Sequence, residues 1–237
     1  MSVQVENVNR FLATTTGREK LCRLVQYFSR FYAFYLYRSG APKDVIQRWS
    51  DLKQHIGNAR KFFRLFKQLE FAQAGIKSLA LKDEVLRITG AAKQFAMFFY
   101  YCSEALVLAN TVNFYKISNA KQVQQFGFKC WFTALAFSIA SSLYKYRTLG
   151  IRKHMLEKSL KAAEKGSAEK DGLQVEASRL HTEKKALNKQ LLQDLVDIII
   201  PTAGLGWIGF DEGIVGLAGM TTSWLAMTSQ WQKVASK

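Results

Sequence analysis

The first strong pattern in the chain lies between residues 17 and 38, where apolar positions recur at helical spacing. At about 100° per residue these side chains share one broad face, formed by Leu21, Leu24, Val25, Phe28, Phe31, Tyr32 and Tyr35. The opposite face is polar and carries Arg23, Gln26 and Arg30. Threonines at 14–16 are candidate N-caps, and Gly40 and Pro42 end the segment, because proline disfavours helix in the residue before it. The pattern predicts an amphipathic helix.

Residues 43–74 carry the same periodicity and predict a second, continuous helix, which contains the stretch GNARKFFRLFKQLEF at 57–71. Its apolar side chains cover about half of the helical circumference and are Ile56, Ala59, Phe62, Phe63, Leu65, Phe66 and Leu69. Its basic side chains lie on the other side and are Lys53, Arg60, Lys61, Arg64 and Lys67. Glu70 is the only acidic residue between 52 and 81, so the polar face is almost entirely positive.

Three structures are compatible with this second helix: a core helix with a solvated back, a nucleic-acid contact, or a helix lying on a membrane. Proteins that stack on bases place aromatic rings on the same surface as the positive groove. Here the aromatic and basic side chains lie on opposite faces, which argues against nucleic acid. An apolar face opposite a basic face is what an interfacial helix on anionic lipid requires. Periodicity alone leaves the core helix and the membrane helix open.

Two apolar segments follow in the middle of the chain. Residues 95–112 contain a single charge, Glu104, and residues 130–144 contain none and lie between Lys129 and Lys145. A spanning helix needs about 20 residues, so both segments are short spans or buried helices. A carboxylate inside an apolar run is a candidate for a buried ion pair or for solute conduction, and Glu104 is the only such residue here.

The C-terminal region is apolar and contains a break. Residues 194–210 are interrupted by Pro201 and several glycines, which predicts a broken or re-entrant segment. Residues 213–231 are uncharged and end at Trp231, which predicts a transmembrane helix. Small residues recur in it at a spacing that lets helices approach closely in a membrane, namely Ala218, Gly219, Thr222, Ser223 and Ala226. These five are candidates for helix–helix packing.

The distribution of charge along the chain separates basic regions from apolar ones. The chain has 34 basic and 18 acidic residues, a formal charge of +16, which implies an anionic partner. The excess lies in residues 1–94 and 145–193, and the rest is neutral. We therefore divide the chain into a basic amphipathic region (1–94), apolar membrane-embedded helices (95–146), a polar linker or surface helix (147–193) and a C-terminal membrane segment (194–237). The expected fold is an all-α, membrane-associated protein with N-terminal amphipathic helices and C-terminal apolar membrane helices.

Candidate chemistry is sparse in the sequence. The chain contains no G-x-S-x-G, P-loop or H-E-x-x-H motif. Its cysteines and histidines are too widely spaced for a zinc motif, at Cys22, Cys102, Cys130, His55, His154 and His181. We expect no catalysis, no cofactor and no metal.

Four ordered stretches resemble the peroxin-11 family: GREKLCRLVQYFSRF (17–31), ARKFFRLFKQLEFAQA (59–74), DLVDIIIPTAGLGWIG (194–209) and GLAGMTTSWLAMTSQWQKV (216–234). The resemblance implies a non-enzymatic protein of the peroxisomal membrane that promotes peroxisome elongation and division. It also implies that a basic amphipathic helix enters the cytosolic leaflet, that copies self-associate as a homo-oligomer, and that the dynamin-type GTPase and its membrane adaptor assemble with it.

By position, the resemblance assigns residue roles to the second helix. Its phenylalanines and Leu69 would enter the leaflet, and the basic residues from Arg60 to Lys67 would contact the headgroups of anionic phospholipid. The alternative function that the family suggests is a channel or metabolite pore, for which Glu104 is the only candidate residue in this sequence.

Overall fold

The computed structural model describes residues 3–162 and 168–235, and every regular element in these ranges is an α-helix. The helices, in chain order, are α1 (Val3–Ala13), α2 (Thr15–Arg38), α3 (Lys43–Phe62), α4 (Lys67–Leu79), α5 (Glu84–Thr111), α6 (Ala120–Ala162), α7 (Ala168–Asp197), α8 (Ile199–Leu205) and α9 (Glu212–Ala235). The prediction of an all-α fold is confirmed.

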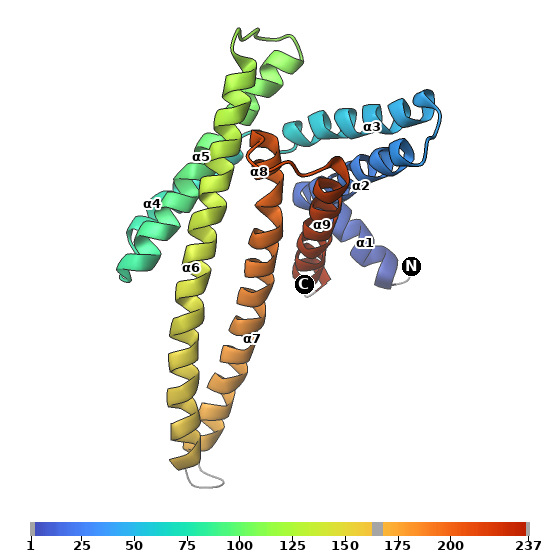
Figure 1. Ribbon diagram of the computed structural model, residues 1–237. Helices are drawn as coiled ribbons and strands as arrows, with labels where there is room; N and C mark the ends of the chain where they lie inside the picture. Colours follow the sequence, from blue (N-terminus) through green and yellow to red (C-terminus); the bar gives the residue numbers. More distant parts are fainter. Residues whose placement is uncertain (1–2, 163–167, 236–237) are drawn as a thin grey trace.

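Two groups of helices make up the molecule (Figure 1). In one, α2 pairs with α3 on one side and with α9 on the other; in the other, α5 lies between α4 and the long α6, which pairs with α7. The short α8 follows α7 and lies between the groups, against α6 and α9. Polar side chains from both groups line the interior between them.

The first amphipathic helix begins and ends where the sequence predicts. The Thr14 side chain accepts a hydrogen bond from the Gly17 backbone N–H at 2.9 Å and caps α2. The helix ends at Arg38, and Gly40 then adopts a left-handed conformation with φ of 74°, which glycine adopts without a steric penalty. The sequence pattern did not predict α1, which is held by the ring of Phe11 against Trp231 of α9 at 5.9 Å.

The prediction of one continuous helix over 43–74 is wrong. Helix α3 ends at Phe62, a short turn follows, and α4 begins at Lys67. Phe66 closes the turn with a φ of +66°, in the left-handed region that costs a residue with a Cβ about 1–2 kcal/mol. None of the turn residues is glycine or proline, so local propensity gave no sign of the break. We call residues 62–69 the α3–α4 corner.

The region expected to be a polar linker or surface helix, 147–193, belongs to a helical hairpin. Helix α6 continues to Ala162, and α7 returns beside it from Ala168 (Figure 1). Gly172 lies inside α7 and does not interrupt it. A narrow apolar seam holds the hairpin together, formed by Leu149, Leu156, Leu160, Leu173, Ala177 and Leu180.

Among the described residues, α6 alone is long and apolar enough to cross a membrane by length and composition. Its 43 residues extend well beyond the 15-residue segment at 130–144 on which the sequence prediction rested, because the polar residues that follow remain helical. Helix α9, which contains the predicted transmembrane segment 213–231, does not meet these criteria. The predicted break between α7 and α9 is present, with Pro201 in α8 and Gly206 left-handed at its end.

Candidate functional site

Helix α2 has the reverse of the polarity that a water-soluble helix shows. Its charged residues Glu19 and Arg23 are buried, with exposed fractions of 3% and 6%, whereas Leu21 and Phe28 are exposed. Charged side chains are seldom buried in soluble proteins unless they are paired. Polar groups turned inward and apolar groups turned outward are expected where the surroundings are lipid.

The first buried pair joins α2 to α3. Both Nε and Nη2 of Arg60 donate to the same Glu19 oxygen, at 3.0 and 2.7 Å, and Arg60 also donates to Gln26. Burial alone would raise the pKa of Glu19, but the charges of Lys20 and Arg60 hold it well below its usual range. Burial lowers the pKa of Lys20 to about 8, against the opposing effect of Glu19. The Glu19 carboxylate is therefore ionised at neutral pH and shared by two cations.

The second pair holds the corner itself. Arg64 Nη2 donates to Glu104 Oε1 at 2.9 Å, and the Tyr100 hydroxyl donates to the same oxygen at 2.9 Å. The other oxygen, Glu104 Oε2, is buried and has no hydrogen-bond partner among the described residues. Of the two roles that the sequence suggested for Glu104, the structure shows the ion pair, which is largely but not fully buried.

Further ion pairs connect α2 to the C-terminal helices. Arg23 donates to Asp197 of α7 at 2.6 Å and to Thr222 of α9 at 3.1 Å. Arg30 and Lys53 both reach Glu212, the first residue of α9, at 2.6 and 3.4 Å. The polar faces of several helices thus converge on one charged interior.

This interior contains a cavity of about 740 Å³ between the two groups of helices. Eight basic side chains and five carboxylates line it, an excess of three positive charges. The basic residues are Lys20, Arg23, Arg30, Lys53, Arg60, Lys61, Arg64 and Lys93, and the acidic residues are Glu19, Glu104, Asp194, Asp197 and Glu212. We call this the charged cavity. Among the described residues no group of His, Cys, Asp or Glu is arranged to hold a metal ion.

Outside the cavity, the α3–α4 corner presents apolar side chains to the surroundings. Phe66 is 70% exposed, Leu69 64% and Phe62 52%, and Phe63 and Leu65 are also exposed. Ala59 is exposed and Ile56 is half-buried. Six of the seven apolar residues expected to enter lipid are therefore exposed, and Ile56 alone among them is partly covered.

The basic residues predicted beside them lie differently from what the continuous helical wheel suggested. Arg60 and Arg64 point inward and are paired with carboxylates, so the expectation that they form an open face does not hold for them. Lys61 lies near Asn58 at 3.5 Å, Lys53 pairs with Glu212, and Lys67 is half-buried at the start of α4. Arg60 and Lys53 lie in α3, before the break, and their surroundings differ because α3 turns its basic face toward Glu19 of α2 and Glu212 of α9.

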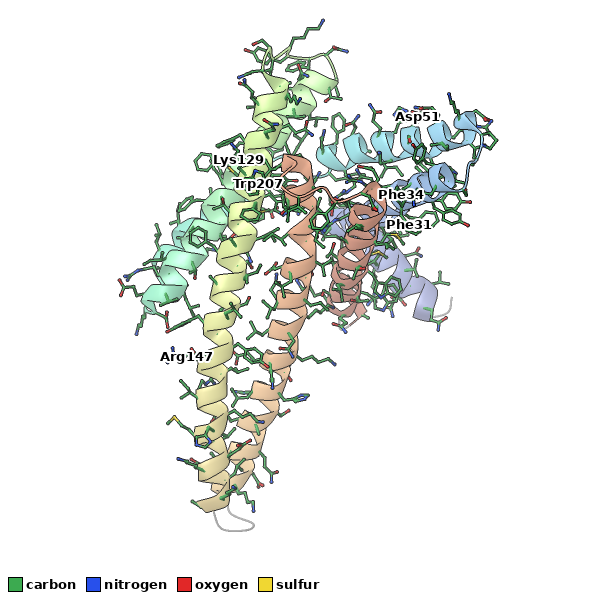
Figure 2. The ribbon with its side chains drawn as sticks, in the orientation of Figure 1. Phe31, Phe34, Asp51, Lys129, Arg147 and Trp207 are labelled. Carbon is green, nitrogen blue, oxygen red and sulfur yellow. The ribbon has the colours of Figure 1, made fainter. Side chains whose placement is uncertain are left out.

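The small residues of α9 face α2 of the same chain. A methyl group at Gly219 would lie 2.1 Å from the Tyr27 ring, and one at Gly216 would lie 2.8 Å from the Phe31 backbone. Figure 2 shows Phe31 and Phe34 on α2 where it lies beside α9. Of the five residues expected to pack helices, four are buried, Ala218, Gly219, Thr222 and Ser223, and Ala226 is half-buried.

Sequence reasoning missed the carboxylates that complete the cavity, Glu19 and Asp197. They are 41 and 174 residues from the arginines that they bind. The only signal in the sequence was the position of Glu19 in the helix predicted over 17–38. That position does not identify an arginine partner so distant in sequence.

Together, the inverted polarity of α2, the exposed apolar corner and the long apolar α6 indicate an α-helical, membrane-associated protein. The profile of one family, described as peroxisomal biogenesis factor 11 (PEX11), matches residues 5–231. The chain therefore belongs to the PEX11 family and is a protein of the peroxisomal membrane, as the names of its relatives also indicate.

The curated relatives match over nearly their full lengths. Peroxisomal biogenesis factor 11 of Schizosaccharomyces pombe is 26% identical over 235 residues, covering 96% of this chain and 95% of the relative. Peroxisomal membrane protein PMP27 of Saccharomyces cerevisiae is 27% identical, covering 94% and 92%. Human peroxisomal membrane protein 11B is 24% identical, covering 92% and 93%. No solved structure matches this chain.

Proposed function

We propose that the protein elongates and remodels the peroxisomal membrane by inserting the α3–α4 corner into one leaflet. The observation that carries the proposal is the exposure of Phe62, Phe66 and Leu69 at the point where the two helices meet. Apolar side chains inserted at the depth of the acyl boundary expand that leaflet relative to the other, which favours curvature. Membership of a family named for peroxisome biogenesis supports a role in peroxisome proliferation.

The energies favour insertion of the corner in its bent form. Transferring an exposed Phe or Leu side chain from water into the acyl region of the leaflet contributes about 1.5–3 kcal/mol. The corner residues are exposed, so no contact within the protein has to break before they insert. Straightening α3 and α4 into one helix would relieve about 1–2 kcal/mol of strain at Phe66. It would also pull Arg60 and Arg64 away from buried carboxylates, at about 3–5 kcal/mol for each pair broken. The ion pairs therefore stay closed, and the corner acts as a short wedge.

This arrangement changes which residues contact headgroups. Arg60 and Arg64 hold the corner in position from inside. Of the five basic residues predicted to contact headgroups, only Lys67, at the start of α4, lies outside the cavity lining. Anionic phospholipid is attracted by about 1 kcal/mol per nearby cation. Apolar insertion therefore contributes more than headgroup attraction.

The test is reconstitution of the full-length protein in vesicles of phosphatidylcholine and phosphatidylserine. We expect the wild-type protein to tubulate them, and the triple variant F62S/F66S/L69S to leave them spherical. A matched control, I151S/M155S/V175S, removes three exposed apolar side chains from the α6–α7 hairpin and should tubulate normally. Equal tubulation by the corner variant and the control would refute insertion of the corner.

Self-association and recruitment of the fission machinery complete the proposal. The small-residue stripe of α9 is occupied by α2, so we place the contact between copies on the outward face of α9, where Leu217 and Trp224 are exposed. A homo-oligomer would concentrate many corners in one patch of membrane. In this proposal the protein performs no catalysis, and the dynamin-type GTPase with its membrane adaptor supplies the energy for division.

The alternative function, a metabolite pore, rests on Glu104. Its contacts with Arg64 and Tyr100 give this carboxylate a structural role at the corner. Solute flux through reconstituted protein that changes in Glu104→Gln while vesicle shape does not would favour the pore.

A further inference from the structure

The charged cavity holds more positive charge than its own carboxylates neutralise. Glu19 forms ion pairs with both Lys20 and Arg60, and Glu212 forms ion pairs with both Arg30 and Lys53. A buried or half-buried cation that shares its carboxylate with a second cation destabilises the fold, because burial removes the water that would otherwise solvate its charge. The remaining volume of about 740 Å³ lies among these cations and is large enough for a ligand.

Lys93 of α5 lines the cavity and makes no direct ion pair with a carboxylate in the described part of the chain. Its ammonium donates to the Ser138 hydroxyl at 2.8 Å, and Ser138 donates in turn to Asp194 at 2.5 Å. A hydroxyl group thus stands between the lysine and the nearest carboxylate. Burial lowers the pKa of Lys93 and of Lys61, which also lines the cavity, and a bound anion would oppose this effect.

We propose that the charged cavity binds a ligand that carries a phosphate dianion or a pyrophosphate, with Lys20 and Lys93 as its principal contacts. The excess of three positive charges favours a multiply charged anion over a single carboxylate, which would leave two charges unmatched. A fatty acid is also disfavoured because its tail would meet charged walls. The four arginines of the cavity are already paired with carboxylates, and a lysine ammonium binds phosphate as a point charge.

The rest of the lining accommodates an organic group attached to the phosphate. Tyr27, Tyr101 and Trp131 line the same cavity, and aromatic rings supply the apolar contacts usual in ligand sites. The phosphate could belong to a soluble phosphorylated metabolite or to a lipid headgroup, and the two sources are separated by experiment. Because neither Lys20 nor Lys93 lies in the α3–α4 corner, this proposal does not depend on the corner entering lipid.

The experiment uses the full-length protein purified in a non-ionic detergent and two probes measured by titration calorimetry. One probe is sodium pyrophosphate, and the other is phosphatidylinositol 4-phosphate in mixed micelles, with phosphatidylcholine micelles as the blank. Saturable pyrophosphate binding supports a soluble ligand. Saturable binding of the phosphoinositide alone supports a lipid headgroup.

Variants then locate the site. K20Q/K93Q should weaken binding by about tenfold or more, equivalent to about 1.4 kcal/mol, whereas K20R/K93R, which keeps both charges, should bind within a few-fold of wild type. The matched control K158Q/K161Q removes two exposed charges at the far end of α6 and should bind normally. Helicity by circular dichroism confirms that each variant folds.

Two results would overturn the proposal: saturable binding of neither probe, or equal weakening by K20Q/K93Q and K158Q/K161Q, which would mean attraction to overall charge. The corner variant F62S/F66S/L69S should bind the probe normally, so failure of corner insertion and failure of this site are distinguishable.

Discussion

Arg60 Nη2 lies 2.7 Å from Glu19 Oε1, and both side chains are buried. The contact joins residues 41 positions apart and holds the end of α3 against α2 immediately before the α3–α4 corner. It explains why Arg60, which was predicted to contact lipid headgroups, points inward, while Phe62 and Phe63 beside it are exposed.

The first prediction concerns the stability contributed by this pair. Glu19→Ala leaves Arg60 and Lys20 buried without their carboxylate, so the free energy of unfolding should fall by about 3–5 kcal/mol. The matched control is Glu6→Ala, which removes an exposed ion pair with Arg10 and should cost less than about 1 kcal/mol. Chemical unfolding in detergent, followed by circular dichroism, measures both. Similar losses for the two variants would contradict the structural role of Glu19.

The second prediction is the pH dependence of the same group. The pKa of Glu19 is lowered in the folded protein, so its ionised form stabilises the fold at pH values above its unfolded pKa of about 4.5. This contribution is lost as the pH falls below about 4.5 toward the folded pKa. In Glu19→Gln the acid-induced loss of stability should therefore be smaller. Unfolding midpoints measured between neutral pH and acid check this, and parallel curves for the two proteins would refute it.

The third prediction tests whether the corner is bent or straight in the membrane. Phe66→Gly and Phe66→Ala both remove the ring, but glycine tolerates the left-handed conformation and alanine does not. If the bent form inserts, Phe66→Gly should be more stable than Phe66→Ala by about 1 kcal/mol and should bind vesicles at least as well. Stronger vesicle binding by Phe66→Ala would show instead that the corner straightens. Vesicle flotation and chemical unfolding measure the two quantities.

The fourth prediction compares two helical glycines. Gly172 has nothing within 4 Å of an added methyl group, so Gly172→Ala should stabilise α7 by about 0.5–1 kcal/mol. Gly219→Ala places a methyl group against the Tyr27 ring and should loosen α9 from α2. The expected result is a higher unfolding temperature for the first variant and a lower one for the second. A rise for both would mean that α9 does not pack closely on α2.

Much of this protein was determined by local sequence. Helical spacing of apolar residues, a threonine cap and a glycine–proline stop were sufficient to predict α2, and the absence of alternating patterns was sufficient to predict an all-α fold. These features act over three or four residues, so they can be seen without knowing what the helix packs against. The apolar residues of the corner were also predicted to face away from the basic residues, and the structure leaves them exposed.

The corner itself and the charged cavity were decided only by tertiary structure. Nothing in the turn residues breaks a helix; the bend is held by Arg60 and Arg64 reaching carboxylates 41 and 40 residues away. A helical wheel treats every polar face as turned to water, whereas here polar faces from α2, α3, α5 and α7 turn toward one another. Charges that have left water need partners, and which partners they find depends on how distant helices pack, a property that periodicity along the chain does not contain.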